Sequence, residues 1–360
     1  MNDVNIFVIV KAALRTTFVF VCHIYYLSYL TWMVILLPLK TLGFKSIYYK
    51  IEGEMQYGML RIVAMWNHYS GYEVLEAGDD ITECLEERTL VLVNHQSAGD
   101  IAILFSAFIN KRQILPNIMW ILENFLKYST IGVVCWIHHD FFIFQGKDIR
   151  QRSLEDLKNH IGEYYKPLQR KWLVLFPEGG FLSKRRQRSQ EYGQRNSLPH
   201  VEHVTIPRIG ALETVINTLK PKNSINNLNS ATNDLSNQHL KYILDITIGY
   251  PNGEPMSILS VLFGHQRPFQ TTVYYRLYPI SEVPQSNEEL QKWILERWVE
   301  KEKMLEDFYR SGKFPQTAHS KAPTLVKQNM SDFLILQAKF AASFFSQYLL
   351  IKLIYHILNI

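Results

Sequence analysis

Two side chains five residues apart, His95 and Asp100, form a pair that could do chemistry together. An imidazole can accept a proton from a hydroxyl group at neutral pH if a partner fixes its tautomer and stabilises the cation that forms. A carboxylate that accepts the ring Nδ1–H does both. We therefore expect His95 to act as a general base that Asp100 orients. The alternative is that Ser97 or Asp100 caps a helix and that His95 is an incidental turn residue.

A second group of candidate residues follows in "KWLVLFPEGGFLSKRR", residues 171–186. Gly179 and Gly180 let backbone amides approach a ligand closely, and Glu178 places an acid directly before them. The basic residues that follow suit the phosphate of a cofactor or of a lipid headgroup. An ordinary turn and a solvated helix face would account for the same pattern. These basic residues are Lys184, Arg185, Arg186 and Arg188.

A third stretch, "VTIPRIGAL" at residues 204–212, places Pro207 between an expected strand and an expected helix. Taken alone, it is a plain strand-to-helix connection. The three stretches share one feature: in each, the candidate residues lie at the end of an expected strand. In open α/β sheets, ligands bind at the carboxyl ends of the strands, so residues in these positions are expected to meet at one site.

The elements that position these residues alternate between strand and helix patterns. We predict an α/β fold with a mainly parallel mixed sheet flanked by helices. The polar residues 220–240, rich in Asn and Ser, are interpreted as a surface loop inserted in this domain. The expected strands are 90–93, 133–144, 172–176, 204–207, 242–249 and 271–278, and the expected helices are 101–110, 119–128, 150–165, 209–219 and 287–309.

Hydrophobicity is concentrated at the two ends of the chain. Residues 17–38 contain no Asp, Glu, Lys or Arg, are long enough to cross a bilayer core, and lack the small-residue cleavage site of a signal peptide. Residues 333–360 are interrupted by Lys339 and Lys352, which fits a short span or an interfacial helix equally well. The expected organisation is an anchor at 1–50, an α/β domain at 51–315 and a C-terminal membrane helix at 333–360.

Composition narrows the class of partner. A formal net charge of +5 over 360 residues is too mild to indicate nucleic acid, but it fits an anionic membrane surface or a phosphorylated ligand. Three cysteines far apart in the sequence indicate neither a disulfide framework nor a zinc site, and so a reducing compartment. In "WIHHD", alternation along an expected strand separates His138 and Asp140 from His139, so we expect no metal site.

The order of the three stretches resembles the glycerolipid acyltransferase superfamily, over roughly residues 85–280. That superfamily is built around an Asn-His-x-x-x-x-Asp block, a Phe-Pro-Glu-Gly block and a later Val/Ile-Pro block. Within it, the chain is most similar to the lysophosphatidylglycerol acyltransferase branch. The matching residues are Asn94, His95 and Asp100, then Phe176, Pro177, Glu178 and Gly179, and then Ile206 and Pro207.

The chain departs from the superfamily pattern at two places that bear on phosphate binding. Gly180 and Phe181 stand where the third block often has Thr and Arg. Gln145 stands where an arginine normally ends the second block, and Lys147 and Arg150 are then the nearest cations in the sequence. The His95–Asp100 pair is unaffected by either departure.

The resemblance implies a membrane-bound enzyme that moves an acyl group from acyl-CoA to a glycerol hydroxyl of a lysophospholipid. The acceptor would be of the lysophosphatidylglycerol or lysophosphatidylethanolamine class, with acyl-CoA as a co-substrate and no resident cofactor. The expected location is the endoplasmic reticulum membrane, with the site facing the cytosol. The alternatives are a CoA-independent phospholipid transacylase, acylation of monoacylglycerol, and an inactive membrane scaffold of the same fold. The residues expected to bind substrate are Glu178, Gly179, Gly180, Lys147, Arg150, Lys184, Arg185 and Pro207.

Overall fold

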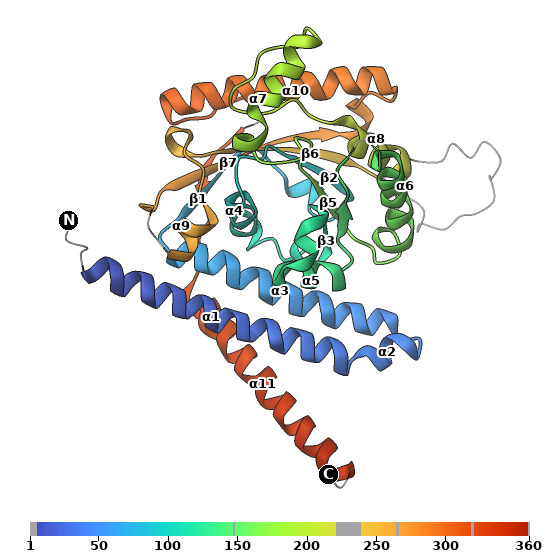
Figure 1. Cartoon of the computed structure of the whole chain (residues 1–360), viewed down its shortest axis with the longest axis vertical. Helices are drawn as coiled ribbons and strands as arrows, with labels where there is room; N and C mark the ends of the chain where they lie inside the picture. The colour runs from blue at the N-terminus through green and yellow to red at the C-terminus, as the bar shows by residue number, and fades with distance from the viewer. Residues whose placement is uncertain (1–5, 147, 221–238, 264–265, 318–319, 359–360) are drawn as a thin grey trace, which may run out of the picture.

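The computed structural model describes residues 6–146, 148–220, 239–263, 266–317 and 320–358. Its centre is one eight-stranded sheet (Figure 1). The strands are β1 (Glu73–Asp79), β2 (Thr89–Val93), β3 (Ile118–Glu123), β4 (Phe141–Ile143), β5 (Trp172–Leu175), β6 (Tyr242–Gly249), β7 (Gln270–Pro279) and β8 (Ser320–Leu325). Their order is β4-β3-β5-β2-β6-β7-β1-β8. The first five run parallel, β7 is antiparallel to β6 and parallel to β1, and β8 closes the edge antiparallel to β1.

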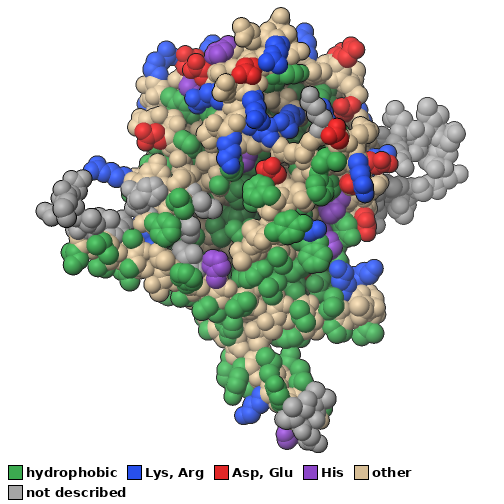
Figure 2. All heavy atoms as spheres, in the orientation of Figure 1, with side chains coloured by type: hydrophobic (Ala, Val, Ile, Leu, Met, Phe, Trp, Pro, Cys, Tyr) green, Lys and Arg blue, Asp and Glu red, His purple; other side chains and the backbone are tan. Residues whose placement is uncertain are grey.

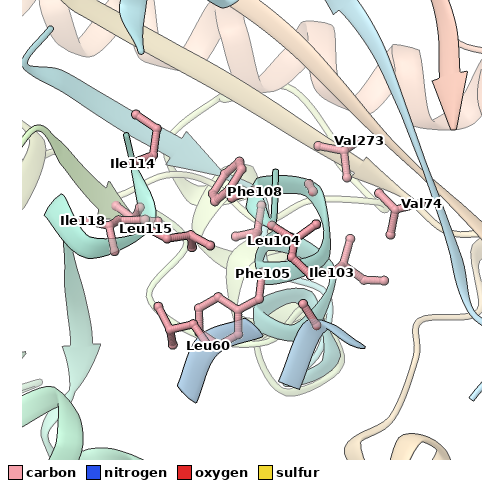
Figure 3. Packing of buried hydrophobic residues seen from close by; sticks show 14 of the residues in the cluster. Leu60, Val74, Ile103, Leu104, Phe105, Phe108, Ile114, Leu115, Ile118 and Val273 are labelled. Carbon is pink, nitrogen blue, oxygen red and sulfur yellow. The ribbon is translucent and has the colours of Figure 1, made fainter. Parts of the chain in front are cut away.

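Helices cover both faces of the sheet. One face packs against α3 (Lys45–Tyr69) and α4 (Gly99–Phe108), as the close view of this core shows (Figure 3). The other face packs against α6 (Arg150–His160), α8 (Ile209–Leu219) and α10 (Asn287–Ser311). Strand β2 is apolar without interruption because Val91 and Val93 enter the first core, whereas Leu90 and Leu92 enter the second. This double burial holds the end of β2 firmly in place.

The helices at the two ends, α1 (Ile6–Ile35) and α11 (Met330–Leu358), contain segments long and apolar enough to cross a membrane. They contact each other through polar side chains: Ser28 Oγ lies 2.8 Å from Ser343 Oγ, and Gln347 Nε2 donates to the Ser28 carbonyl at 2.8 Å. Figure 1 shows α1 and α3 on one side of the sheet domain and α11 projecting away from it. The sequence suggested two separate apolar ends, whereas the structure joins them.

The shorter helices are α2 (Leu37–Thr41), α5 (Thr130–Ile137), α7 (Leu182–Arg195) and α9 (Ile258–Phe263). The α/β fold class with a mainly parallel sheet is confirmed. The anchor boundary expected at residue 50 falls inside the continuous helix α3, and β8, beyond the expected domain end at 315, joins the sheet. The expected loop 220–240 lies mostly outside the described residues, but Leu240 is buried and its amide bonds the Leu219 carbonyl at 3.1 Å.

Three predicted elements are wrong. Residues 119–128, expected as a helix, contain most of β3, because a parallel strand buried on both faces has the same continuous apolar run as a buried helix. Residues 133–144, expected as a strand, form the end of α5 and then β4. Ser129 caps α5 by accepting from the Gly132 amide at 3.0 Å, and a serine in this position is a sequence signal for the start of a helix. Residues 204–207 are not a strand.

Candidate active site

The candidate residues gather at one edge of the sheet because its five parallel strands end there. His95 follows β2, Gln145 follows β4, Glu178 follows β5, and Tyr250 follows β6, while Glu123 ends β3. Parallel strands point their carboxyl ends the same way, so residues distant in sequence become neighbours. On the face of the molecule drawn in Figure 2, a hollow shows hydrophobic side chains within it, and Lys and Arg side chains gather above it.

The expected pair between His95 and Asp100 is present. Nδ1 of His95 lies 2.9 Å from Oδ2 of Asp100. That carboxylate is fully buried and also accepts hydrogen bonds from the backbone amides of Gln96 at 2.7 Å and Ser97 at 3.0 Å. Its other oxygen accepts from the Tyr250 hydroxyl at 2.6 Å. Because an ionised carboxylate only accepts, Nδ1 carries the proton and Nε2 is left as the base.

The imidazole ring is positioned as well as paired. It stacks on Phe176, with ring centroids 4.1 Å apart, and meets the edge of Phe181 at 4.6 Å. The side chain of His95 is 14% exposed, and no hydrogen bond to Nε2 occurs among the described residues. The turn after His95 passes so close to the backbone of Met256 that it requires a glycine at position 99, where a Cβ atom would lie 2.2 Å from the Met256 carbonyl oxygen. The ring therefore has one fixed tautomer and one free basic nitrogen.

Glu178 lies beneath the histidine and faces the protein interior. It is 2% exposed, and its carboxylate accepts from the His95 amide at 3.1 Å, the Thr205 amide at 3.0 Å and the Trp298 indole at 3.3 Å. Burial raises the pKa of Glu178 to about 8, although these hydrogen bonds lower it. Three elements of the fold therefore occupy its oxygens, and the expected role of Glu178 in holding the acceptor stays a prediction.

The two glycines after Glu178 differ in what they offer a ligand. Both have positive φ, +67° at Gly179 and +154° at Gly180. The Gly179 amide is already bonded to the Phe176 carbonyl at 3.0 Å, whereas the Gly180 amide has no hydrogen-bond partner in the described part of the chain. A Cβ atom at Gly180 would lie 2.3 Å from Arg185 Nε, so the side chain of Arg185 rests directly on this glycine.

Basic side chains surround the glycine turn. Gln145 Nε2 donates to the Gly179 carbonyl at 2.9 Å and its Oε1 accepts from Arg185, so this glutamine braces both. The guanidinium of Arg208 lies 3.3 Å from a Cβ atom built on Gly179. Partial burial lowers the pKa of Arg208, and the nearby charges of Arg185 and Arg150 lower it further. None of the ion pairs formed by the described residues includes these three arginines, so their charge remains available to an anion.

The remaining residues expected to bind substrate make fewer contacts with the glycine turn. Lys184 is exposed, with Nζ 5.6 Å from the centre of the Phe181 ring; Lys147 lies outside the described residues; Pro207 is half-buried. Sequence reasoning missed two residues of the site, Arg208 and Tyr250. The signal for Arg208 was its position directly after the Ile-Pro block, whereas Tyr250 lies 150 residues from its partner and carried no local signal.

The histidines of "WIHHD" do not lie on a strand as expected. His138 ends α5, is fully buried, and its Nδ1 lies 3.0 Å from both oxygens of Glu52 on α3. His139 has a positive φ of 65°, which belongs to the turn that follows the helix. Among the described residues, no group of three or more His, Cys, Asp or Glu side chains could hold a metal ion. The cluster with Glu52 joins α5 to α3 and is separate from His95.

Comparisons with known proteins identify the family of this chain. A family model described as Acyltransferase C-terminus matches residues 260–335. The chain is similar to the acyl-CoA:lysophosphatidylglycerol acyltransferase 1 of Mus musculus, at 37% identity over 98% of this chain and 96% of that protein. The Homo sapiens protein of the same name is 38% identical over 97% and 96% of the two chains.

Two further similarities are more distant. The lysocardiolipin acyltransferase 1 of Gallus gallus is 28% identical over 73% of this chain and 67% of that protein. Among solved structures, the 1-acyl-sn-glycerophosphate acyltransferase PlsC from Thermotoga maritima is 12% identical, with a TM-score of 0.43 over 81% of this chain and 97% of that chain. From the identity to the two mammalian proteins over nearly the whole chain, this chain belongs to the glycerolipid acyltransferase superfamily, in its lysophosphatidylglycerol acyltransferase branch.

Proposed function

We propose that this chain transfers an acyl group from acyl-CoA to a glycerol hydroxyl of a lysophospholipid, with lysophosphatidylglycerol as the first acceptor to test. The observation that carries the proposal is the His95–Asp100 pair at the sheet edge, with Nε2 of the histidine free. The names of the mammalian relatives support the substrate classes. Lysophosphatidylethanolamine is the second acceptor class in this proposal.

The proposed reaction needs no covalent enzyme intermediate, because a thioester is already activated. His95 Nε2 removes the proton of the acceptor hydroxyl as its oxygen attacks the thioester carbonyl. Asp100 stabilises the resulting imidazolium. The tetrahedral intermediate then collapses, the C–S bond breaks, and the CoA sulfur takes the proton from the imidazolium. The free amide of Gly180 is the candidate donor to the oxyanion, since that of Gly179 is already used.

In this proposal the acceptor's phosphate binds the arginines around the glycine turn. Arg185 and Arg208 lie against Gly180 and Gly179, and Arg150 approaches Arg208 closely enough to lower its pKa. Charge-assisted hydrogen bonds from guanidinium groups to phosphate are short and directional, so they would hold the hydroxyl near His95. Gln145 then takes the supporting position in which the superfamily normally has an arginine, by bracing Arg185.

Attachment to a membrane is the last part of the proposal. Helices α1 and α11 would hold the domain at the bilayer, where both the lysophospholipid and the long acyl chain are found. We further propose the endoplasmic reticulum as the compartment, with the His95 edge of the sheet facing the cytosol, where acyl-CoA is available. The hydrophobic hollow in Figure 2 supports this arrangement, because the acyl chain needs an apolar channel.

The proposal is tested with membranes that contain the full chain. Acyl-CoA is supplied as the sole acyl donor, with a panel of lysophospholipids and monoacylglycerol as acceptors. His95→Ala should lower the transfer rate by at least about 100-fold, the range for loss of a general base. His200→Ala is the matched control, because His200 is an exposed histidine 3.4 Å from a carboxylate, Glu202. Transfer that persists in His95→Ala, or that requires a diacyl phospholipid as donor, would refute the proposed reaction.

A further inference from the structure

The segment that follows β3 carries an apolar surface that nothing in the described chain covers. It consists of the short 3-10 helix η3 (Asn124–Tyr128) and α5, and its outward side chains are large. Soluble surfaces rarely gather such side chains without a partner. We name this set the η3–α5 surface: Phe125 is 61% exposed, Tyr128 84%, Ile131 56% and Trp136 57%.

The η3–α5 surface is held rigidly. The turn between its two helices is closed by Ser129, whose hydroxyl accepts from the Gly132 amide at 3.0 Å. Gly132 packs so tightly that a Cβ atom there would lie 1.8 Å from the Leu126 carbonyl oxygen. On the inner side of α5, Val134 packs in one cluster with Tyr29 of α1. The exposed side chains are therefore displayed by a fixed element and do not belong to a loose loop.

The position of this surface indicates what covers it. The same cluster that holds α5 joins it to α1 and α3, and α9 contacts α1 on the same side of the domain (Figure 1). Helix α9 is also apolar outward, with Leu259 54% and Phe263 44% exposed. Lys127 lies with Nζ 5.9 Å from the centre of the Trp136 ring. Exposed aromatic side chains with lysine beside them are typical of the boundary between lipid headgroups and acyl chains.

We propose that the η3–α5 surface enters this boundary layer of the bilayer and seats the sheet domain on the membrane, in addition to the attachment by α1 and α11. The inference rests on the membrane attachment proposed above. Its consequence for the reaction comes from chain continuity: η3 begins directly after Glu123, whose charge acts on both Arg185 and Arg208. A lysophospholipid in the leaflet that the η3–α5 surface enters would then reach Arg185 and Arg208 without leaving the lipid layer.

A fluorescent label measures this contact directly. The full chain with Ile131→Cys is labelled with an environment-sensitive dye and bound to vesicles of phosphatidylcholine and phosphatidylglycerol. Tyr192→Cys is the matched control, because Tyr192 is 52% exposed on α7, which Figure 1 shows on the far side of the sheet from α1 and α3. The parent chain, treated in the same way, supplies the background from its own cysteines.

We expect the label at Ile131 to emit at shorter wavelength, to resist quenching by aqueous iodide, and to be quenched by lipids brominated high on the acyl chain. The label at Tyr192 should show the reverse. Equal quenching of both labels by iodide, on protein that floats with the vesicles, would overturn this inference and leave the membrane attachment intact. Protein that does not float with the vesicles would overturn both. Neither reading depends on enzymatic activity.

A second variant connects the surface to turnover. Ile131→Glu places a charge on a side chain that is exposed in the fold, so folding should be retained. We expect a roughly tenfold lower rate with a vesicle-borne acceptor and an unchanged rate with the same acceptor dispersed in detergent, because only the first depends on interfacial seating. Equal rates of the variant and the parent chain on vesicles would contradict the proposal.

Discussion

Replacing Asp100 by asparagine separates the two roles that its carboxylate could have. In the structure this group both orients His95 and caps the turn, since Oδ2 accepts from the ring Nδ1 and from the amides of Gln96 and Ser97. An asparagine with its carbonyl oxygen in the same place keeps all three bonds. Its amide nitrogen then faces Tyr250, whose hydroxyl can rotate to accept. In the opposite orientation the amide nitrogen would face the N–H groups of His95, Gln96 and Ser97, which are all donors, so only the first orientation is expected.

The structure therefore predicts a small change in stability and a large change in rate. Charge-assisted hydrogen bonds become neutral ones, and the buried charge no longer has to be desolvated, so the free energy of unfolding should fall by only about 1–2 kcal/mol. The amide cannot stabilise an imidazolium. General-base catalysis contributes about 10²–10⁴-fold, and His95 keeps its tautomer here, so we expect a loss of roughly 10²–10³, or about 3–4 kcal/mol in the barrier.

The assay compares the initial rate of acyl transfer from acyl-CoA to a lysophospholipid with the thermal unfolding midpoint of the same preparation. Asp79→Asn is the matched control: Asp79 accepts from the Leu277 amide at 2.9 Å and ends β1, which runs opposite to β2. Its rate should be unchanged. If Asp100→Asn retains more than about half of the rate, the carboxylate is only a cap, because Asn and Asp cap equally well, and the proposed mechanism is refuted.

Four further predictions follow from other contacts. Tyr250→Phe, which leaves one oxygen of Asp100 without its buried donor, should lower turnover by about threefold to tenfold with little change in the KM for acyl-CoA; an unchanged pH profile and rate would show that the contact is merely structural. Because the pKa of Glu178 is raised above its unfolded value, its contribution to native stability is greatest at low pH and is lost as pH rises toward about 8, so the melting temperature of the parent chain, measured relative to that of Glu178→Gln, should fall from about pH 5 and level off above about pH 8. Arg208→Gln should raise the KM for a phosphorylated acceptor by about 10-fold to 100-fold, whereas the exposed Arg195→Gln should not; equal KM values would remove Arg208 from the site. The protein should remain in the membrane pellet after high salt and after carbonate, because salt does not weaken the burial of α1 in the bilayer; release by salt would contradict the proposed anchoring. Protease added to sealed microsomes should cut within residues 220–240 if the site faces the cytosol, and full protection of these residues would contradict the proposed orientation.

Local patterns in the sequence were sufficient to predict the His95–Asp100 contact and the apolar helices at the two ends of the chain. The run Leu90–Val93 can only be a buried element, and the six residues from His95 to Asp100 span one turn, so their contact depends on no distant residue. The Phe-Pro-Glu-Gly turn follows β5 in the same way. The apolar lengths of the termini depend on composition alone. In each case the information lies within one element and its flanking turn.

Only the tertiary structure decided which distant groups complete the site. Tyr250 reaches Asp100 because β6 lies beside β2, and strand order has no local signature. Burial of the Glu178 carboxylate depends on α10 closing over it, a contact that its position in the sequence does not reveal. The segment from Ile118 to Ile143 was misassigned because strands buried on both faces and buried helices share one apolar pattern. The apolar pattern of a sequence indicates which residues are buried, whereas the tertiary structure determines which residues they pack against.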